Sequence, residues 1–109
     1  MKDLAALRVR YEQDPIEIQI GGLASNLSRI AWFMKRPEVA ADLSATFRES
    51  KYFAEWAAVH APLEMQAALA EVQIEMALWE RKSAQGRCSP EQPEAWAQRL
   101  LRMSGLVAD

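Results

Sequence analysis

Residues 61–85, APLEMQAALAEVQIEMALWERKSAQ, decide the fold because they form one long helical pattern with apolar residues on two opposite sides. Both apolar sets step by four and three residues: one holds Met65, Leu69, Val72, Met76 and Trp79, and the other holds Leu63, Ala67, Ala70, Ile74 and Ala77. At about 100° per residue, the two sets lie on nearly opposite faces of one helix. A helix packed against one core needs a single apolar stripe. The second stripe therefore predicts a helix that is central in its bundle or that also meets a second chain.

The composition predicts one soluble domain, residues 1–109. Half of the 109 residues are hydrophobic, and the formal net charge of −2 provides no positive field for holding nucleic acid or an anionic membrane. The longest apolar run, residues 30–34, is far shorter than the ~20 residues of a membrane span, and residues 1–13 show no secretory signal. Cys88 is the only cysteine, which excludes an internal disulfide and fits a reducing compartment. We therefore expect a cytoplasmic protein without a membrane span.

The segment 16–34 fits two patterns. Apolar and polar residues alternate over 16–20, as in a strand, but helical spacing continues over the whole of 16–34, and the longer window favours a helix. Gly21 and Gly22 weaken this helix by about 1 kcal/mol each relative to alanine. They predict a local kink or close helix packing, and the alternative is a hinge.

Capping signals predict the other helix ends. A short helix over 3–13 precedes Asp14 and Pro15, which suit an N-cap and a first helical position. Ser89, with Gln92 three residues later, predicts a capping box at the start of the C-terminal helix. We expect that helix to end at Gly105 and to turn three residues inward: Trp96, Leu100 and Met103.

Residues 38–60 form a further helical pattern with two apolar faces. The larger face holds Val39, Leu43, Phe47, Phe53 and Ala57, and the smaller, roughly opposite face holds Ala41, Ala45, Tyr52 and Trp56. Ala61 and Pro62 separate this helix from the next, and so tight a connection favours an antiparallel neighbour. The sequence therefore predicts an all-α fold: an antiparallel four-helix bundle with a short N-terminal helix or arm.

The chain shows no catalytic, cofactor-binding or metal-ligating motif. His60 is the only histidine; we interpret it as a polar residue at a helix C-terminus, with a catalytic base or an axial ligand as the alternatives. Di-iron bundles need two Glu-x-x-His motifs, which one histidine cannot supply. Cys88 is interpreted as an incidental loop thiol, because no activating base accompanies it. We predict no catalytic residue, no cofactor and no metal.

The double apolar faces favour a non-enzymatic interaction module, most simply a homodimer or a chain that binds a helical protein partner. Tryptophan and tyrosine often anchor interfaces, and the candidate interface residues are Tyr52, Trp56, Leu63, Ala67, Ala70 and Ile74. Core packing is the default interpretation of the four tryptophans, Trp32, Trp56, Trp79 and Trp96. Two alternatives stay open: a small-ligand or pigment carrier with a tryptophan-lined pocket near His60, and an enzyme of unrecognised type.

Four stretches of the sequence resemble those of a known family: IQIGGLASNL at 18–27, ESKYFAEW at 49–56, VQIEMALW at 72–79 and WAQRLLRMSGL at 96–106. They resemble an uncharacterised family of short all-helical cyanobacterial proteins. The likeness covers about two thirds of the chain and departs in the loop over 82–94. It implies a cytoplasmic protein of a photosynthetic bacterium, and it implies no activity, cofactor or functional residue.

Overall fold

Every regular element in the computed structural model, which describes residues 3–87 and 89–106, is a helix. The elements are α1 (Leu4–Gln13), α2 (Ile16–Met34), a 3₁₀ helix η1 (Pro37–Val39), α3 (Ala40–Ala58), α4 (Leu63–Ala84) and α5 (Glu91–Ser104). The predicted all-α class is therefore confirmed for these residues. The predicted helix over 38–60 is two residues too long at each end, because a 3₁₀ turn begins at Pro37 and Val39 has non-helical backbone angles.

Short connections change the predicted helix starts. Asp3 caps α1, with its Oδ1 accepting a hydrogen bond from the backbone N–H of Ala6 at 3.2 Å. The prediction that Asp14 caps α2 is wrong, because Asp14 already ends α1, where its own N–H donates to the carbonyl of Tyr11. Pro15 takes the flanking position of α2 instead, and its carbonyl accepts the first backbone hydrogen bonds of that helix.

The predicted helix over 16–34 is confirmed, and its two glycines do not interrupt it. A Cβ atom at Gly21 would lie 2.7 Å from Cδ1 of Leu106, which follows α5. A Cβ at Gly22 would lie 3.6 Å from Tyr11 Cε1, an ordinary van der Waals contact. Gly21 thus provides room for close packing of the chain beyond α5.

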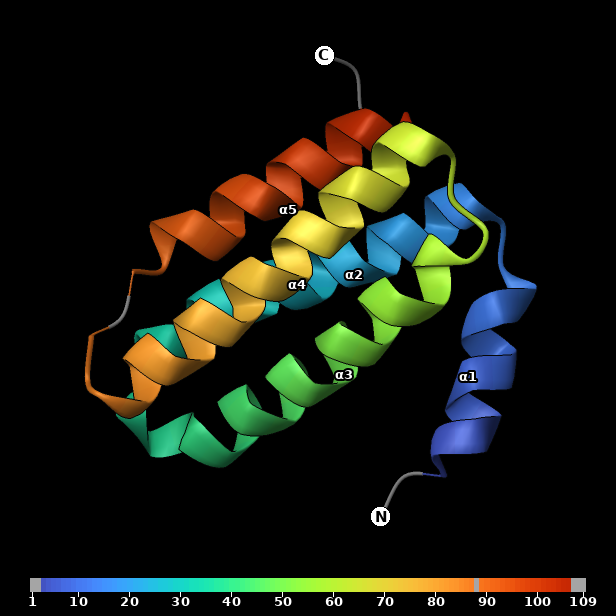
Figure 1. Cartoon of the computed structure of the whole chain (residues 1–109). Helices are drawn as coiled ribbons and strands as arrows, with labels where there is room; N and C mark the ends of the chain where they lie inside the picture. Colours follow the sequence, from blue (N-terminus) through green and yellow to red (C-terminus); the bar gives the residue numbers. More distant parts are fainter. Residues whose placement is uncertain (1–2, 88, 107–109) are drawn as a thin grey trace.

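Helix α2 packs against both α3 and α5, and α4 lies between α3 and α5 (Figure 1). Helix α1 contacts α3 and stands to one side of the other helices (Figure 1). The radius of gyration of 13.4 Å equals the roughly 13 Å of a compact domain of this length. The largest fully buried side chains are Trp79, Phe47, Ile20, Leu23, Leu27, Ile30, Leu69, Met76 and Leu100.

Of the three residues predicted to turn inward from α5, Leu100 is fully buried and Trp96 is half-buried against the core. Pro93, Ala97 and Leu100 are its buried residues, whereas Met103 is exposed, so the prediction for Met103 is wrong. Pro93, Ala97 and Leu100 step by four and three residues along one side of α5, and at about 100° per residue Met103 lies to one side of that stripe. Gly105 ends α5 in the left-handed conformation, as predicted.

The capping box predicted at Ser89 is also wrong. No side chain caps α5, and Oε1 of Gln92 accepts a hydrogen bond from the indole Nε1–H of Trp79 at 2.9 Å. A buried indole N–H that lacks an acceptor would lose the free energy of its hydrogen bonds to water. The hydrogen bond from the buried indole to Gln92 is therefore more favourable than a side-chain cap at the start of α5.

The four tryptophans have different environments. Trp79 and Trp56 are buried, and Trp96 is half-buried beneath the guanidinium of Arg99. Trp32 is 50% exposed, so core packing is the wrong interpretation for this residue. Its ring stacks under the Arg36 guanidinium, whose carbon lies 3.5 Å from the ring centroid. Within the residues that the structure describes, no helix is long and apolar enough to cross a membrane.

Candidate interaction surface

Helix α4 carries one buried and one exposed apolar face, as its sequence pattern predicts. The buried face holds Met65, Leu69, Val72, Met76 and Trp79, each at most 5% exposed. The exposed face, hereafter the outer α4 face, holds Leu63, Ala67, Ala70, Ile74, Ala77 and Leu78. Leu63 is 80% exposed, Ile74 is 65% exposed and Leu78 is 45% exposed. The residues that the structure describes therefore cover only one of the two apolar sides of α4.

Polar contacts with the neighbouring helices border the outer α4 face. On one side, Nη1 of Arg99 in α5 lies 3.7 Å from Oε2 of Glu71. On the other side, the Lys51 ammonium in α3 pairs with Glu80, and the Lys51 carbonyl accepts from Nε2 of Gln73 at 3.5 Å. These contacts hold α4 between its neighbours with the apolar residues turned outward.

The ends of the outer α4 face carry opposite charges. Glu64 is exposed in the first turn of α4, and Arg81 and Lys82 are in the last turn. Each charge favours the helix dipole at its own end. The face is therefore apolar along its length, acidic at one end and basic at the other.

The outer α4 face is contiguous because its members repeat along 16 helical residues, 63–78, a length of about 24 Å. Scattered apolar side chains are ordinary on protein surfaces, whereas a contiguous apolar strip with a polar border is typical of an interaction site. Leu78 was absent from the predicted set. Its position four residues after Ile74 is the spacing signal that could have identified it.

The predicted interface residues Tyr52 and Trp56 lie elsewhere, on the side of α3 next to α1. Trp56 is 4% exposed, its ring centroid lies 6.0 Å from that of Tyr11, and the Arg8 guanidinium carbon lies 5.8 Å from its ring centroid. Tyr52 stacks on Trp56 with centroids 5.5 Å apart and is half-buried. The second apolar face of α3 is thus partly covered by α1. Of the six predicted residues, Trp56 is buried in the core, and Tyr52 lies apart from the four on α4.

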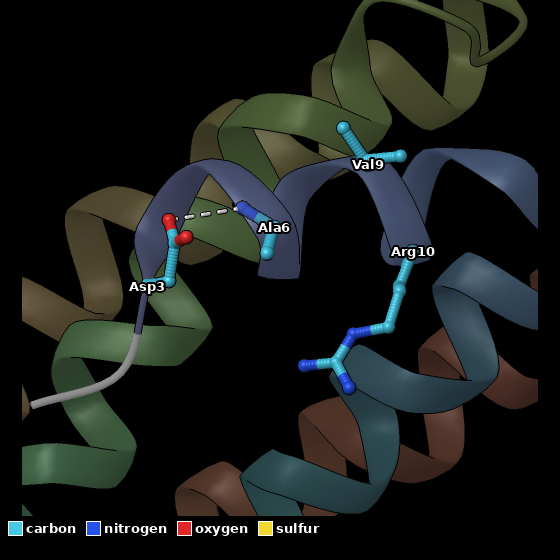
Figure 2. A pocket seen from close by; sticks show the side chains of 4 residues that line it. All are labelled: Asp3, Ala6, Val9 and Arg10. Carbon is cyan, nitrogen blue, oxygen red and sulfur yellow. Dashed lines mark hydrogen bonds between the residues drawn. The ribbon is translucent and has the colours of Figure 1, made fainter.

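A cavity of about 470 Å³ lies where α1 leaves α3 uncovered. Its lining is shared between the two helices and consists of Leu4, Leu7, Ala41, Ser44, Ala45, Arg48, Glu49 and Tyr52. A second hollow, of about 580 Å³, is lined by Asp3, Ala6, Val9 and Arg10 (Figure 2). All four of these residues belong to α1 or its cap, so one helix surface bounds the hollow. Neither lining contains a tryptophan.

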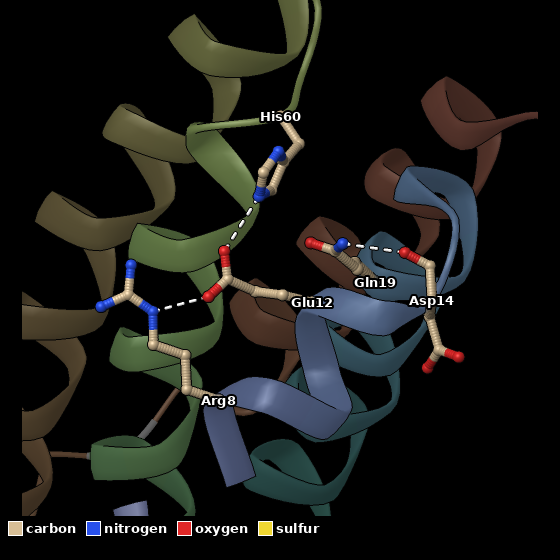
Figure 3. A network of polar contacts seen from close by, with 5 residues as sticks. All are labelled: Arg8, Glu12, Asp14, Gln19 and His60. Carbon is tan, nitrogen blue, oxygen red and sulfur yellow. Dashed lines mark hydrogen bonds and ion pairs between the residues drawn. The ribbon is translucent and has the colours of Figure 1, made fainter. Parts of the chain in front are cut away.

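His60 takes part in a polar network that attaches α1 to the connection between α3 and α4. Its Nε2 lies 2.9 Å from Oε2 of Glu12, whose Oε1 accepts from Nε of Arg8 at 2.6 Å (Figure 3). The hydrogen bond with His60, followed by that with Arg8, holds the pKa of Glu12 below its ordinary value. The network therefore keeps Glu12 ionised to lower pH and stabilises the docked position of α1.

A second set of contacts attaches the end of α1 to α2. The Tyr11 hydroxyl donates to the carbonyl of Gln19 at 2.5 Å. In turn, Nε2 of Gln19 donates to the carbonyl of Asp14 at 2.9 Å (Figure 3). The Tyr11 ring stacks on Phe53, with centroids 4.0 Å apart. Burial raises the pKa of the Tyr11 phenol above its ordinary value, which keeps this donor protonated.

Among residues 3–87 and 89–106, no three histidine, cysteine or acidic side chains are placed to hold a metal ion. Cys88, interpreted above as an incidental thiol, lies outside the described residues. No protein-family model, curated protein or solved structure matches this chain. The resemblance to cyanobacterial helical proteins therefore stays a prediction.

Proposed function

We propose that this chain is a non-enzymatic helical interaction module that forms a homodimer through the outer α4 face. The observation that carries the proposal is the exposure of Leu63 and Ile74, at 80% and 65%, on a helix whose other face is fully packed. Removing such side chains from water is the main favourable contribution to protein association. A second copy presents the same strip, so a two-fold pairing would cover both strips at once.

The proposed architecture is an antiparallel bundle of α2, α3, α4 and α5, with α1 as an arm. Support comes from the short connections before and after α3, which favour antiparallel neighbours, and from the packing of α2 on α3 and of α3 on α4. In such a bundle the outer α4 face points away from the core. We also place the module in the cytoplasm, because its single cysteine fits a reducing compartment.

The size of the strip indicates a weak dimer. A strip about 24 Å long and about 10 Å wide would bury roughly 240 Å² per copy, well under the ~800 Å² per partner of a standard stable interface. Additional contacts from α3 and α5 would enlarge this area at the borders. We therefore expect a dissociation constant in the micromolar range, about 1–100 μM.

Sedimentation velocity between about 1 and 200 μM tests the proposal. The wild-type mass should rise from 12.3 kDa toward twice that value as the concentration increases. Ile74→Glu should stay monomeric, because it places a charge in the centre of the strip. Val9→Glu is the matched control: Val9 is 58% exposed on α1, so this variant should dimerise like the wild type. Circular dichroism verifies that both variants fold. A wild type that is monomeric throughout, or an Ile74→Glu variant that dimerises normally, would contradict the proposal.

A further inference from the structure

The charges and side-chain sizes along α4 also indicate how two copies would be oriented. We infer that the outer α4 faces pair antiparallel, with the two-fold axis at the level of residue 72 along the helix. This inference rests on the homodimer proposed above and adds the orientation, the register and the residues that select them.

Side-chain size favours the antiparallel register. With the axis at the level of residue 72, residues equally far from position 72 along α4 meet across the interface. Ile74 of each copy therefore faces Ala70 of the other. The large side chain then fits over the small one, and Ala67 meets Ala77 with room for close approach. A parallel register would instead stack Ile74 on Ile74 and leave a gap between the two Ala70 side chains.

Charge favours the same arrangement. Glu64 lies eight residues before the axis, and Arg81 and Lys82 lie nine and ten residues after it. Antiparallel pairing therefore brings Glu64 of each copy to the basic end of the other, and symmetry repeats the contact at both ends. A parallel pair would place Arg81 against Arg81 within the apolar strip. Opposite charges at such positions select the orientation of paired helices.

One repulsive contact near the axis is already compensated. Glu71 lies one residue from the position of the axis, so the two copies bring their Glu71 side chains close together. Arg99 of the same copy has its Nη1 3.7 Å from the Glu71 carboxylate, and its positive charge offsets that repulsion. The acidic border of the strip is therefore compatible with the antiparallel pair.

Spin-label distances test the orientation. In a Cys88→Ser background, two variants, Ala84→Cys and Glu75→Cys, each receive a nitroxide label. Double electron–electron resonance measures the distance between the two labels at position 84 of the dimer. Continuous-wave line broadening measures the distance between the two labels at position 75. Antiparallel pairing predicts about 36 Å along the axis between labels at 84 and about 9 Å between labels at 75, from the helical rise of 1.5 Å per residue. Parallel pairing predicts a short spacing near 10 Å at both sites, which would overturn the inference.

A charge exchange tests the named residues. Glu64→Lys should weaken dimerisation about tenfold at low ionic strength, because it puts like charges together at both ends. Adding Lys82→Glu to that variant should restore the wild-type constant to within about threefold. A double variant that dimerises no better than Glu64→Lys alone would overturn the register. These failures leave the dimer and its sensitivity to Ile74→Glu intact, whereas a monomeric wild type would overturn both proposals.

Discussion

Removing the indole of Trp79 tests how much of the stability depends on the buried face of α4. Trp79 is 2% exposed, and its Nε1–H donates to Gln92 at the start of α5. Trp79→Ala deletes a large buried side chain, leaves a cavity and breaks that hydrogen bond, so we expect a loss of about 3–5 kcal/mol. A domain of this size is stabilised by about 5–15 kcal/mol in total. The substitution should therefore remove a fifth or more of the stability.

Urea unfolding followed by far-ultraviolet circular dichroism measures this loss without depending on tryptophan fluorescence. With a denaturant slope of about 1–3 kcal/mol per molar, the midpoint should fall by roughly 2 M. Trp32→Ala is the matched control, because Trp32 is 50% exposed, and it should cost less than about 1.5 kcal/mol. A loss below about 1 kcal/mol for Trp79→Ala, or equal losses for the two variants, would refute the placement of Trp79 in the core.

Two further predictions concern α2 and the α1 network. Gly22→Ala should raise the free energy of unfolding by about 0.5–1 kcal/mol, measured by thermal unfolding. Gly21→Ala should raise it less, because its added methyl group requires Leu106 to move. A larger gain for Gly21→Ala than for Gly22→Ala would contradict the close contact with Leu106. Glu12 has a lowered pKa in the folded chain, so its stabilising effect is complete above its ordinary pKa of 4.5 and is lost as the pH falls through the folded value. Urea midpoints of wild type and Glu12→Gln should therefore converge below pH 4.5, and a constant difference down to the most acid pH would exclude this role.

The two faces of α4 were predictable because a step of four and three residues shows directly in the sequence. Side-chain size indicates which face points inward, since the buried set includes two methionines and Trp79, and half of the outer set is alanine. The covering of Trp56 was not predictable, because the short apolar stripe of α1, which includes Leu7 and Tyr11, does not indicate the helix on which it packs. Periodicity describes the face of one helix and carries no information about which distant segment covers it.

The capping errors have a related cause. Asp14 and Gln92 both fit local sequence rules, but each serves another contact: Asp14 ends α1, and Gln92 accepts from a buried indole 13 residues earlier in the chain. Local capping rules predict the partner of a side chain from the backbone N–H groups nearest to it in sequence. In the folded chain, a buried donor that water cannot reach needs the same acceptor. The hydrogen bond to that donor then forms in place of the helix cap.

The packing of α2 against α5 has a consequence for biosynthesis. Residues 16–34 leave the ribosome early, yet the helix that covers one of their sides spans residues 91–104 and is translated more than 50 residues later. Until then, isoleucine and leucine side chains of the nascent chain remain in water, where they are open to chaperones and to aggregation. A premature stop before codon 91 should therefore yield an insoluble product rather than a smaller functional one.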